Sequence, residues 1–223
     1  MPYDLQGVLG LKVQRNLFMR RFQLIKRIIN LFLTIAYLHF VLPLFLLFAL
    51  LIRLDSPGKI FYGQTRLGHK GKPFKMWKFR TMVQNADDVL ADYLENRPEV
   101  NEEWEQNHKL KADPRVTRVG RFLRQTSLDE LPQLWNVLRG EMSLVGPRPI
   151  VREEIKYYGP SYGTYRKVKP GMTGLWQVSG RSDTAYDYRV RLDEYYVRHW
   201  SIWLDFYILI RTVWAVIARK GAY

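Results

Sequence analysis

The stretch IINLFLTIAYLHFVLPLFLLFALLI, from Ile28 to Ile52, is the most hydrophobic part of the 223-residue chain. Its strongly polar side chains are Asn30, Thr34 and His39, and none carries a formal charge with histidine neutral. As one helix it would be about 37 Å long at ~1.5 Å per residue, longer than the ~30 Å hydrocarbon core of a bilayer. The stretch therefore predicts a membrane helix, to which the rest of the chain must be attached.

Two features of this stretch favour a re-entrant helix over a spanning one. Pro43 removes a backbone donor and clashes with the carbonyl of His39, so we expect a kink there. Positive residues flank both sides: Arg15, Arg20, Arg21, Lys26 and Arg27 before it, and Arg53, Lys59, Arg66, Lys70, Lys72 and Lys75 after it. Because positive flanks favour the cytoplasm, a helix that enters and leaves on one face satisfies both. The alternatives are a spanning helix and a buried core helix.

A second apolar segment runs from Ile202 to Ala218. Asp205 and Arg211 interrupt it, and a charge at the centre of a membrane helix costs ~2.5–3.5 kcal/mol on insertion scales. Its aromatic residues are Trp203, Phe206, Tyr207 and Trp214. An interfacial helix fits this pattern, and a helix packed on the body of the protein fits it equally well.

The remaining pattern predicts a small α+β domain. Apolar and polar residues alternate from Lys59 to Arg80 around a Gly68–Lys72 turn, which predicts a hairpin. Further helices are expected from Met82 to about His108, from Leu128 to Leu138 and from Ala185 to Trp200. In the last of these, a stripe of Tyr188, Leu192, Tyr195 and Tyr196 at helical spacing is interpreted as core.

The charge of the chain indicates an anionic partner. Thirty-five lysine and arginine residues face 21 acidic ones, for a net charge of +14. Nucleic acid, anionic lipid and phosphorylated substrates all suit such a surplus, and composition does not choose among them. The chain has no cysteine, which excludes disulfides, thiolate metal sites and a cysteine nucleophile.

The block DPRVTRVGRFLRQTSLDELPQLWNVLRGEMSLVGPRP, Asp113 to Pro149, holds the candidate chemistry. Asp129 and Glu130 are adjacent, and the arginines around them are Arg115, Arg118, Arg121, Arg124, Arg139 and Arg148. A carboxylate can attack a phosphoryl group, arginine binds phosphate through two donors, and one or two carboxylates suffice to hold Mg²⁺. The block therefore has the ingredients of metal-assisted phosphoryl transfer.

The same carboxylates also match a structural pattern. Ser127 and Glu130 have the spacing of a capping box, and acidic residues stabilise a first helical turn. Pro132 fits poorly behind a Ser127 cap but fits a helix that starts nearer Asp129. The two interpretations are compatible, since a helix terminus would keep a nucleophilic carboxylate ionised. Gly146–Pro149 is a stiff turn that displays Arg148.

Four strings resemble the bacterial sugar transferases, also called small monotopic phosphoglycosyl transferases or polyprenyl glycosylphosphotransferases. They are LDSPGKIFYGQTRLGHKGKPFKMWKFRTM, the Asp113–Pro149 block, VKPGMTGLWQVSGRS and the ending KGAY. Together they cover most of the chain from Leu54 to Tyr223. The resemblance implies a re-entrant helix kinked at its proline, although Leu42 stands where relatives often carry serine.

The resemblance also implies a two-step reaction. Asp129 would attack the β-phosphate of a UDP-sugar, release UMP, and pass the sugar phosphate to polyprenyl phosphate, usually undecaprenyl phosphate. Glu130 matches the second member of the catalytic pair, and Mg²⁺ is the implied ion, with Asp129 as its ligand. Arg124 and Arg148 match arginines near the phosphates, and Arg181 matches a position linked with nucleotide-sugar recognition.

The resulting expectation is a mainly helical α+β enzyme of the inner membrane. It divides into a basic arm (residues 1–27), a re-entrant helix kinked at Pro43 (28–52) and a catalytic domain on the cytoplasmic face (53–223), with interfacial amphipathic helices and a β-hairpin. The expected partners are a UDP-sugar (glucose or galactose), undecaprenyl phosphate, membrane lipids and a second copy of the chain, without nucleic acid. The reaction would begin exopolysaccharide, capsule or O-antigen assembly. The rival hypotheses are a non-catalytic membrane scaffold and a membrane-tethered nucleic-acid binder.

Overall fold

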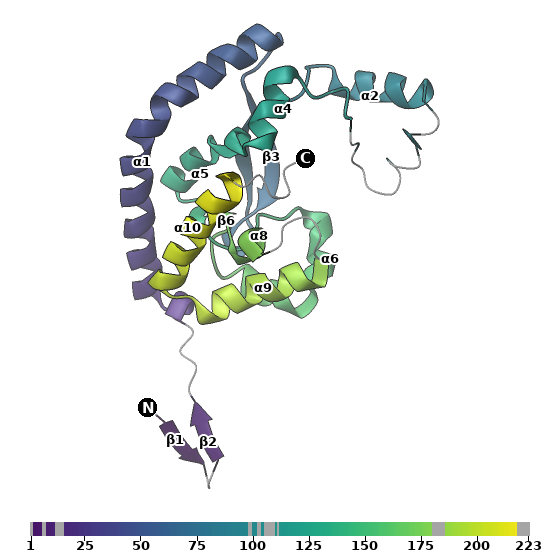
Figure 1. The fold of residues 1–223 in the computed structure, drawn as a ribbon. Coiled ribbons are helices and arrows are strands. Elements are labelled where there is room, and N and C mark those ends of the chain that lie inside the picture. Colours follow the sequence, from purple (N-terminus) through teal and green to yellow (C-terminus); the bar gives the residue numbers. More distant parts are fainter. Residues whose placement is uncertain are drawn as a thin grey trace.

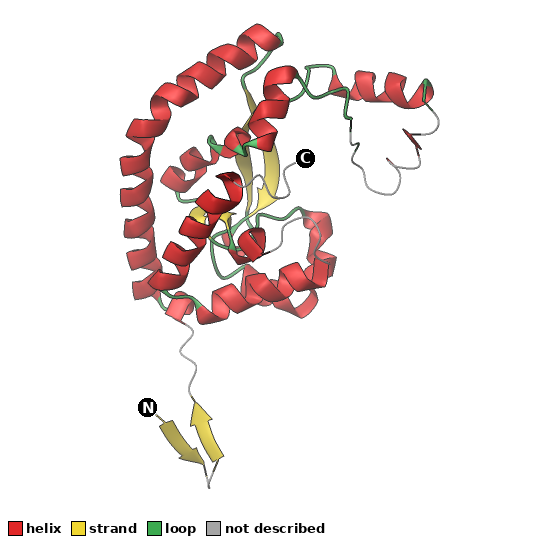
Figure 2. Ribbon diagram, in the orientation of Figure 1, coloured by secondary structure: helices red, strands yellow, loops and turns green. Residues whose placement is uncertain are grey.

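A long N-terminal helix runs along one side of a mainly helical α+β body in the computed structural model (Figures 1 and 2). The structure describes residues 2–5, 8–11, 16–97, 100–101, 104, 110, 112–179 and 186–217. The helices of four or more residues are α1 (Arg20–Asp55), α2 (Ala86–Glu95), α4 (Arg118–Gln125), α5 (Gln133–Arg139), α6 (Ile155–Tyr158), α7 (Tyr162–Tyr165), α8 (Leu175–Ser179), α9 (Tyr186–His199) and α10 (Ile202–Ile217). Short 3-10 turns are η1 (Asn16–Phe18), η2 (His69–Gly71), η3 (Leu128–Glu130), η4 (Arg152–Glu154) and η5 (Gly159–Ser161). The strands are β1 (Pro2–Leu5), β2 (Val8–Leu11), β3 (Phe61–Leu67), β4 (Pro73–Phe79), β5 (Ser143–Val145) and β6 (Gly171–Thr173).

Helix α1 is the one described helix that is long and apolar enough to cross a membrane. It begins at Arg20, earlier than the predicted Ile28, and ends at Asp55. The helix is continuous through Pro43, and Figure 1 shows that its axis curves along its length. Only 17% of its most apolar window is buried. The buried-core-helix alternative is therefore wrong.

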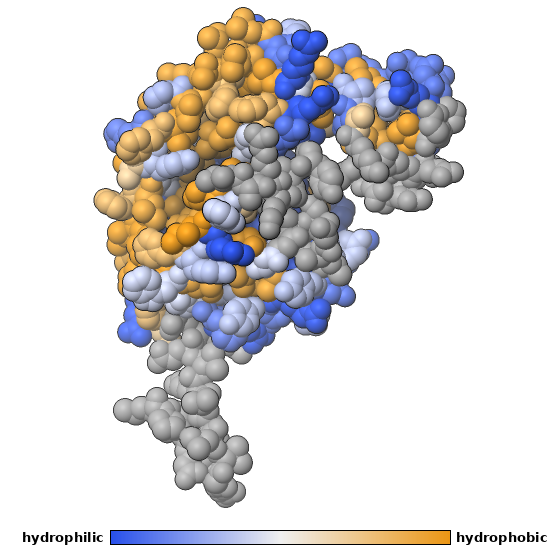
Figure 3. All heavy atoms as spheres, in the orientation of Figure 1, coloured by the Kyte–Doolittle hydropathy of each residue, from blue (hydrophilic) through white to orange (hydrophobic). Residues whose placement is uncertain are grey.

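The polarity of α1 is the reverse of that of a helix in a water-soluble protein. Its buried residues include Lys26, Asn30 and Thr34, whereas Phe32 and Phe40 are 71% and 78% exposed. In its first half polar side chains thus face the body of the protein and most apolar ones face outward, whereas further along Val41, Phe48 and Ile52 pack into the core. Figure 3 shows this hydrophobic surface along the edge that α1 forms. Such a large exposed apolar surface marks an interaction with a membrane or a partner.

The predicted hairpin is confirmed. Strands β3 and β4 pair in antiparallel register from Phe61–Phe79 to Leu67–Pro73, with η2 at the turn. Lys70 and Gly71 take positive φ angles of 61° and 73° there, and glycine adopts such angles without strain. Strand β4 of the hairpin contacts η3, the turn that carries Asp129 and Glu130.

Helix α9 confirms a predicted helix but not its predicted buried face. Tyr196 is buried, whereas Tyr188 and Tyr195 are 41% and 52% exposed. The buried face of α9 consists of Val190, Asp193, Tyr196 and Val197. The core assignment of the tyrosine stripe is therefore wrong for its exposed members. Apolar spacing did not predict the buried face, because a charged residue, Asp193, lies at its centre.

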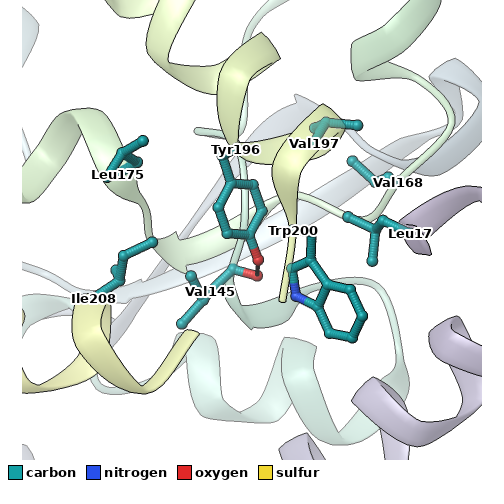
Figure 4. Packing of buried hydrophobic residues seen from close by; sticks show 8 residues of the cluster. All are labelled: Leu17, Val145, Val168, Leu175, Tyr196, Val197, Trp200 and Ile208. Carbon is teal, nitrogen blue, oxygen red and sulfur yellow. Dashed lines mark hydrogen bonds between the residues drawn. The ribbon is translucent and has the colours of Figure 1, made fainter. Parts of the chain in front are cut away.

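One hydrophobic core cluster lies where η1, β5, α8, α9 and α10 meet. Figure 4 shows eight side chains of this cluster pointing toward one another, with the Tyr196 hydroxyl oxygen 3.2 Å from the Val145 carbonyl oxygen. The cluster consists of Leu17, Val145, Val168, Leu175, Tyr196, Val197, Trp200 and Ile208. It joins the turn before α1 to α9 and α10, whereas Val41, Phe48 and Ile52 of α1 pack in a second cluster.

A buried ion pair joins α1 to α10 beside this core. The Lys26 ammonium contacts Asp205 and donates to the Tyr196 hydroxyl at 2.8 Å. Asp205 also accepts from Tyr196 at 2.6 Å and from the Trp200 indole at 3.0 Å. Of the two charges that interrupt the C-terminal apolar segment, Asp205 therefore faces inward, whereas Arg211 is exposed. Meanwhile Trp203 of α10 is 81% exposed, so α10 packs on the body with one face and exposes an apolar face on the other.

Replacing Asp205 by alanine is expected to lower the free energy of unfolding by ~3–5 kcal/mol, because the Lys26 ammonium is then left buried without its counter-ion. Chemical denaturation in detergent micelles measures this. Asp187→Ala is the matched control, because Asp187 is exposed on α9. A loss below ~1 kcal/mol, the range of surface pairs, would contradict the importance of the pair.

Candidate active site

The two carboxylates lie on η3, between α4 and α5. Ser127, just before the turn, has a left-handed backbone (φ 56°), and its side chain makes no capping hydrogen bond. Helix α5 begins only at Gln133, directly after Pro132. The predicted capping box is therefore wrong, and neither Asp129 nor Glu130 serves to cap a helix.

A lysine from the hairpin bridges the two carboxylates. The Lys78 ammonium lies 2.7 Å from Glu130 Oε1 and 3.5 Å from Asp129 Oδ2. Lys78 was not predicted as a site residue. The signal for it lay in the strand pattern, since Lys78 shares one face of β4 with the buried Met76. A charged side chain on the buried face of a strand needs a partner, and here it has two.

The environment of Asp129 raises its pKa. The residue is only 9% exposed. Burial raises the pKa of the Asp129 carboxyl, and the charge of Glu130 adds to this, while Lys78 and Arg124 oppose it. This corrects the expectation that a helix terminus would keep Asp129 readily ionised. The ionised carboxylate is instead poorly solvated, which makes it a better base and nucleophile toward a phosphorus atom.

Glu130 and Lys78 shift the opposite way. Burial works against the charge of Glu130, but Lys78, and then Arg148 and Gln133, outweigh it, so the pKa of Glu130 is lowered. Burial also opposes the charge of Lys78, but the two carboxylates prevail and its pKa is raised. Neighbouring carboxyls with diverging pKa values take different roles. Glu130 is the counter-ion of Lys78, and Asp129 is the more basic of the two.

Two of the predicted arginines lie near this pair. Arg124, from α4, donates through Nε to Thr81 Oγ1 at 2.8 Å, and its charge lowers the pKa of Asp129. Arg148 lowers the pKa of Glu130, and its guanidinium lies 5.5 Å from the ring centroid of Trp176. Three segments of the chain therefore bring positive charge near the carboxylates: β4, α4 and the loop after β5.

The other predicted arginines do not contribute in this way. Arg115 pairs with Asp113 at 2.7 Å, and Arg139 lies 3.4 Å from Glu141. Arg118 and Arg121 are exposed on α4. Arg181, predicted to recognise the nucleotide sugar, lies outside the described residues.

The loop that displays Arg148 is supported by a second segment. Strands β5 and β6 pair in parallel, and the Gly146 nitrogen donates to the Thr173 carbonyl at 2.9 Å. A Cβ at Gly171 would lie 2.1 Å from the Gly146 nitrogen, so only glycine fits there. Two glycine-containing segments that are separate in the sequence, Gly146–Pro149 and Gly171–Thr173, therefore pack together and support the backbone of Arg148.

Asp193, from α9, holds the same loop from beneath. It is buried, accepts from the Tyr158 hydroxyl at 2.7 Å and receives the Arg148 backbone N–H at 3.4 Å. Burial raises the pKa of Asp193 to about 7, against the effect of the Tyr158 hydrogen bond. The sequence did not indicate this residue, because Asp193 and Arg148 are 45 residues apart in the chain.

The carboxylate pair is suited to Mg²⁺ only together with a phosphate. Among the described residues, no three histidine or acidic side chains form a metal-binding group. Mg²⁺ at phosphate sites usually takes one or two protein carboxylates and completes its shell with water and substrate oxygens. Asp129 fits this donor set better than Glu130, because Lys78 already occupies Glu130 Oε1.

The chain matches a protein-family model and several known proteins. The family model described as "Bacterial sugar transferase" matches residues 21–219. An undecaprenyl-phosphate galactose phosphotransferase of Salmonella typhimurium is 49% identical over 216 residues, which are 97% of this chain and 45% of that protein. The exopolysaccharide production protein ExoY of Sinorhizobium fredii is 48% identical over 198 residues, 89% of this chain and 88% of ExoY.

A further relative acts on another sugar. The UDP-glucose:undecaprenyl-phosphate glucose-1-phosphate transferase of Escherichia coli is 41% identical over 210 residues, 90% of this chain and 42% of that protein. The chain thus spans about half the length of several curated relatives that it matches, 45% in the case of the Salmonella protein.

Proposed function

The chain belongs to the bacterial sugar transferase family, and we propose that it transfers a sugar 1-phosphate from a UDP-sugar to undecaprenyl phosphate and releases UMP. The observation that carries the proposal is the buried Asp129 beside Glu130, bridged by Lys78 and flanked by Arg124 and Arg148. Such a carboxylate among cations suits covalent phosphoryl transfer. Neither a non-catalytic scaffold nor a nucleic-acid binder requires a buried carboxylate pair among cations.

The first step is an attack by an Asp129 carboxylate oxygen on the β-phosphorus of the UDP-sugar. A bond forms between that oxygen and the phosphorus, and the bond from the phosphorus to the bridging oxygen breaks. UMP leaves with the electron pair, and the sugar phosphate stays on Asp129 as an acyl phosphate. Lys78, Arg124 and Arg148 neutralise charge on the phosphoryl oxygens during this step.

The second step returns Asp129 to its carboxylate form. An oxygen of undecaprenyl phosphate attacks the same phosphorus, the acyl phosphate bond breaks, and the lipid diphosphate sugar leaves. The electrostatics favour this exchange, because the cations that neutralised the first phosphoryl group also serve the second. Mg²⁺, when bound, would be held by Asp129 and would add positive charge to the phosphates.

The apolar surface supports placement at a membrane. The outward face of α1 carries exposed apolar residues from Leu24 (60% exposed) to Leu54 (73% exposed), and Trp203 and Trp214 of α10 are also exposed. With positive residues at both ends, α1 suits a re-entrant helix at the cytoplasmic leaflet. The catalytic domain would then meet both the soluble UDP-sugar and the lipid acceptor at the inner membrane.

The relatives' names support a choice of donor sugar and pathway. Galactose and glucose are named in the relatives from Salmonella and Escherichia, and exopolysaccharide production in ExoY. We propose a UDP-hexose, glucose or galactose, as donor and the start of a surface polysaccharide as the role. A screen of UMP release across UDP-sugars separates the two hexoses.

The test of the covalent step uses the purified chain without the acceptor lipid. On addition of the UDP-sugar and Mg²⁺, we expect at most one UMP per protein and a mass increase of one hexose phosphate on the peptide that contains Asp129. Undecaprenyl phosphate should then remove the added mass. Continuous turnover only when both substrates are present, without any labelled peptide, would point to direct transfer and contradict the proposal.

A further inference from the structure

A second site lies away from the carboxylates, at the start of α1. It is a cavity of about 310 Å³ between the first turns of α1, strand β5 and the Lys167–Lys169 segment. This volume lies at the lower end of those of small-molecule sites. None of the residues Lys78, Arg124, Asp129, Glu130 and Arg148 lines it.

The surface of the cavity is mainly apolar, but several of the residues that line it are basic. Its basic side chains are Arg20, Lys26, Arg27, His69, Lys167 and Lys169, and no aspartate or glutamate is among the described residues that line it. Two of these cations have partners outside the cavity: Lys26 contacts Asp205, and Arg27 donates to the carbonyls of Val137 and Leu138. Burial and the neighbouring lysines lower the pKa of His69, which favours its neutral form. Arg20, Lys167 and Lys169 leave a positive charge that no acidic residue of the described lining balances.

The uncompensated cations are arranged from the rim inward. Arg20 and Lys167 are exposed, Lys169 is half-buried, and the Asn30–Ser143 hydrogen bond lies at the buried end. Within the described part of the chain, no carboxylate lies within ion-pairing distance of Arg20, Lys167 or Lys169. Burial and the charge of Arg27 lower the pKa of Lys169. A bound anion would relieve this repulsion.

Apolar side chains continue the cavity onto the outer face of α1. Leu24 lines the cavity and is 60% exposed, and Ile28, one turn further along the helix, is 59% exposed. A nucleotide or a free phosphate has no apolar chain to pack against Leu24 and Ile28. An amphiphile does, because its phosphate can lie among the lysines while its chains follow α1.

We propose that this cavity binds the phosphate headgroup of an anionic membrane phospholipid, with its acyl chains along Leu24 and Ile28. The proposal rests on the membrane placement of α1 proposed above. The site would fix the depth and orientation of α1 at the cytoplasmic leaflet, where anionic lipids attract basic residues. It takes a lipid that is not consumed, in contrast to the acceptor at Asp129.

The experiment compares the full chain with a Lys167→Gln/Lys169→Gln variant. The matched control is Arg152→Gln/Lys156→Gln, which removes two exposed cations elsewhere. Sedimentation with phosphatidylcholine vesicles, with and without phosphatidylglycerol, measures partitioning. At ~1 kcal/mol per cation near an anionic surface, each cavity lysine should account for about a fivefold gain from phosphatidylglycerol. The cavity variant should lose this gain, and the control should keep it.

A second measurement separates a built site from general surface attraction. Native mass spectrometry of the chain in detergent, with short-chain phosphatidylglycerol added, should show one saturable lipid that the cavity variant lacks. Equal loss in the control variant, or equal competition by inorganic phosphate or by undecaprenyl phosphate, would overturn the assignment. Failure of the wild-type chain to bind phosphatidylcholine vesicles would instead contradict the membrane placement of α1. Thermal unfolding of both variants confirms that they are folded.

Discussion

Replacing Asp129 by asparagine is expected to lower UMP release from the UDP-sugar by about 10⁴-fold or more, as loss of a covalent nucleophile does in other enzymes. Asparagine has the same shape, but its amide oxygen carries no charge to attack phosphorus. The labelled peptide should disappear together with the UMP burst. A coupled assay of UMP with the purified chain measures the rate, and peptide mass analysis measures the intermediate.

The fold of this variant should be intact. Burial raises the pKa of Asp129, so folding disfavours its ionised form. The stability that this raised pKa contributes is present at pH values below the pKa of the unfolded chain and is lost as the pH rises through the pKa of the folded state. At neutral pH, asparagine should therefore leave the melting temperature unchanged or slightly higher. Asp88→Asn, at an exposed position of α2, is the matched control and should keep full activity. UMP release near the wild-type rate in the Asp129 variant would contradict the nucleophile assignment.

The parts of the fold that local pattern decides were predicted from the sequence. The β3–β4 hairpin follows from alternation and a glycine-rich turn, α9 from helical spacing of its tyrosines and leucine, and α10 from a continuous apolar segment. The start of α1 at Arg20 did not follow. Its first turns carry cations that look solvent-exposed, yet Lys26 is buried against Asp205 near the other end of the chain. Only the tertiary structure brings such a pair together.

The candidate site shows the same division. Asp129, Glu130, Arg124 and Arg148 are in one sequence block, so chemistry and resemblance both pointed to them. Lys78, which bridges the carboxylates, comes from a hairpin about fifty residues earlier, as the separations of 51 and 52 show. The capping box failed for a local reason, since Ser127 adopts a left-handed backbone and its side chain makes no capping hydrogen bond. Residue spacing alone does not reveal such a turn.

Replacing Lys78 by methionine is expected to lower kcat by about 10²–10³-fold, the usual cost of removing one preorganised group that stabilises charge in the transition state. Methionine keeps much of the length and apolar stem of lysine, so the lost feature is the ammonium group. Lys75→Met, at an exposed position of the same strand, is the matched control and should stay near wild type. Lys78→Arg should retain part of the activity, because it keeps the charge.

The pH profile distinguishes this electrostatic role from a loss of folding. Lys78 lowers the pKa of Asp129 against the effect of burial, so its removal should raise that pKa further. Because the attack needs the ionised carboxylate, the acidic limb of kcat/KM should move to higher pH in the methionine variant. Arginine at the same position should restore the limb toward the wild-type pH, which a purely structural defect would not do. An unshifted limb with a full loss of kcat would show that Lys78 acts on the substrate phosphates and not through Asp129.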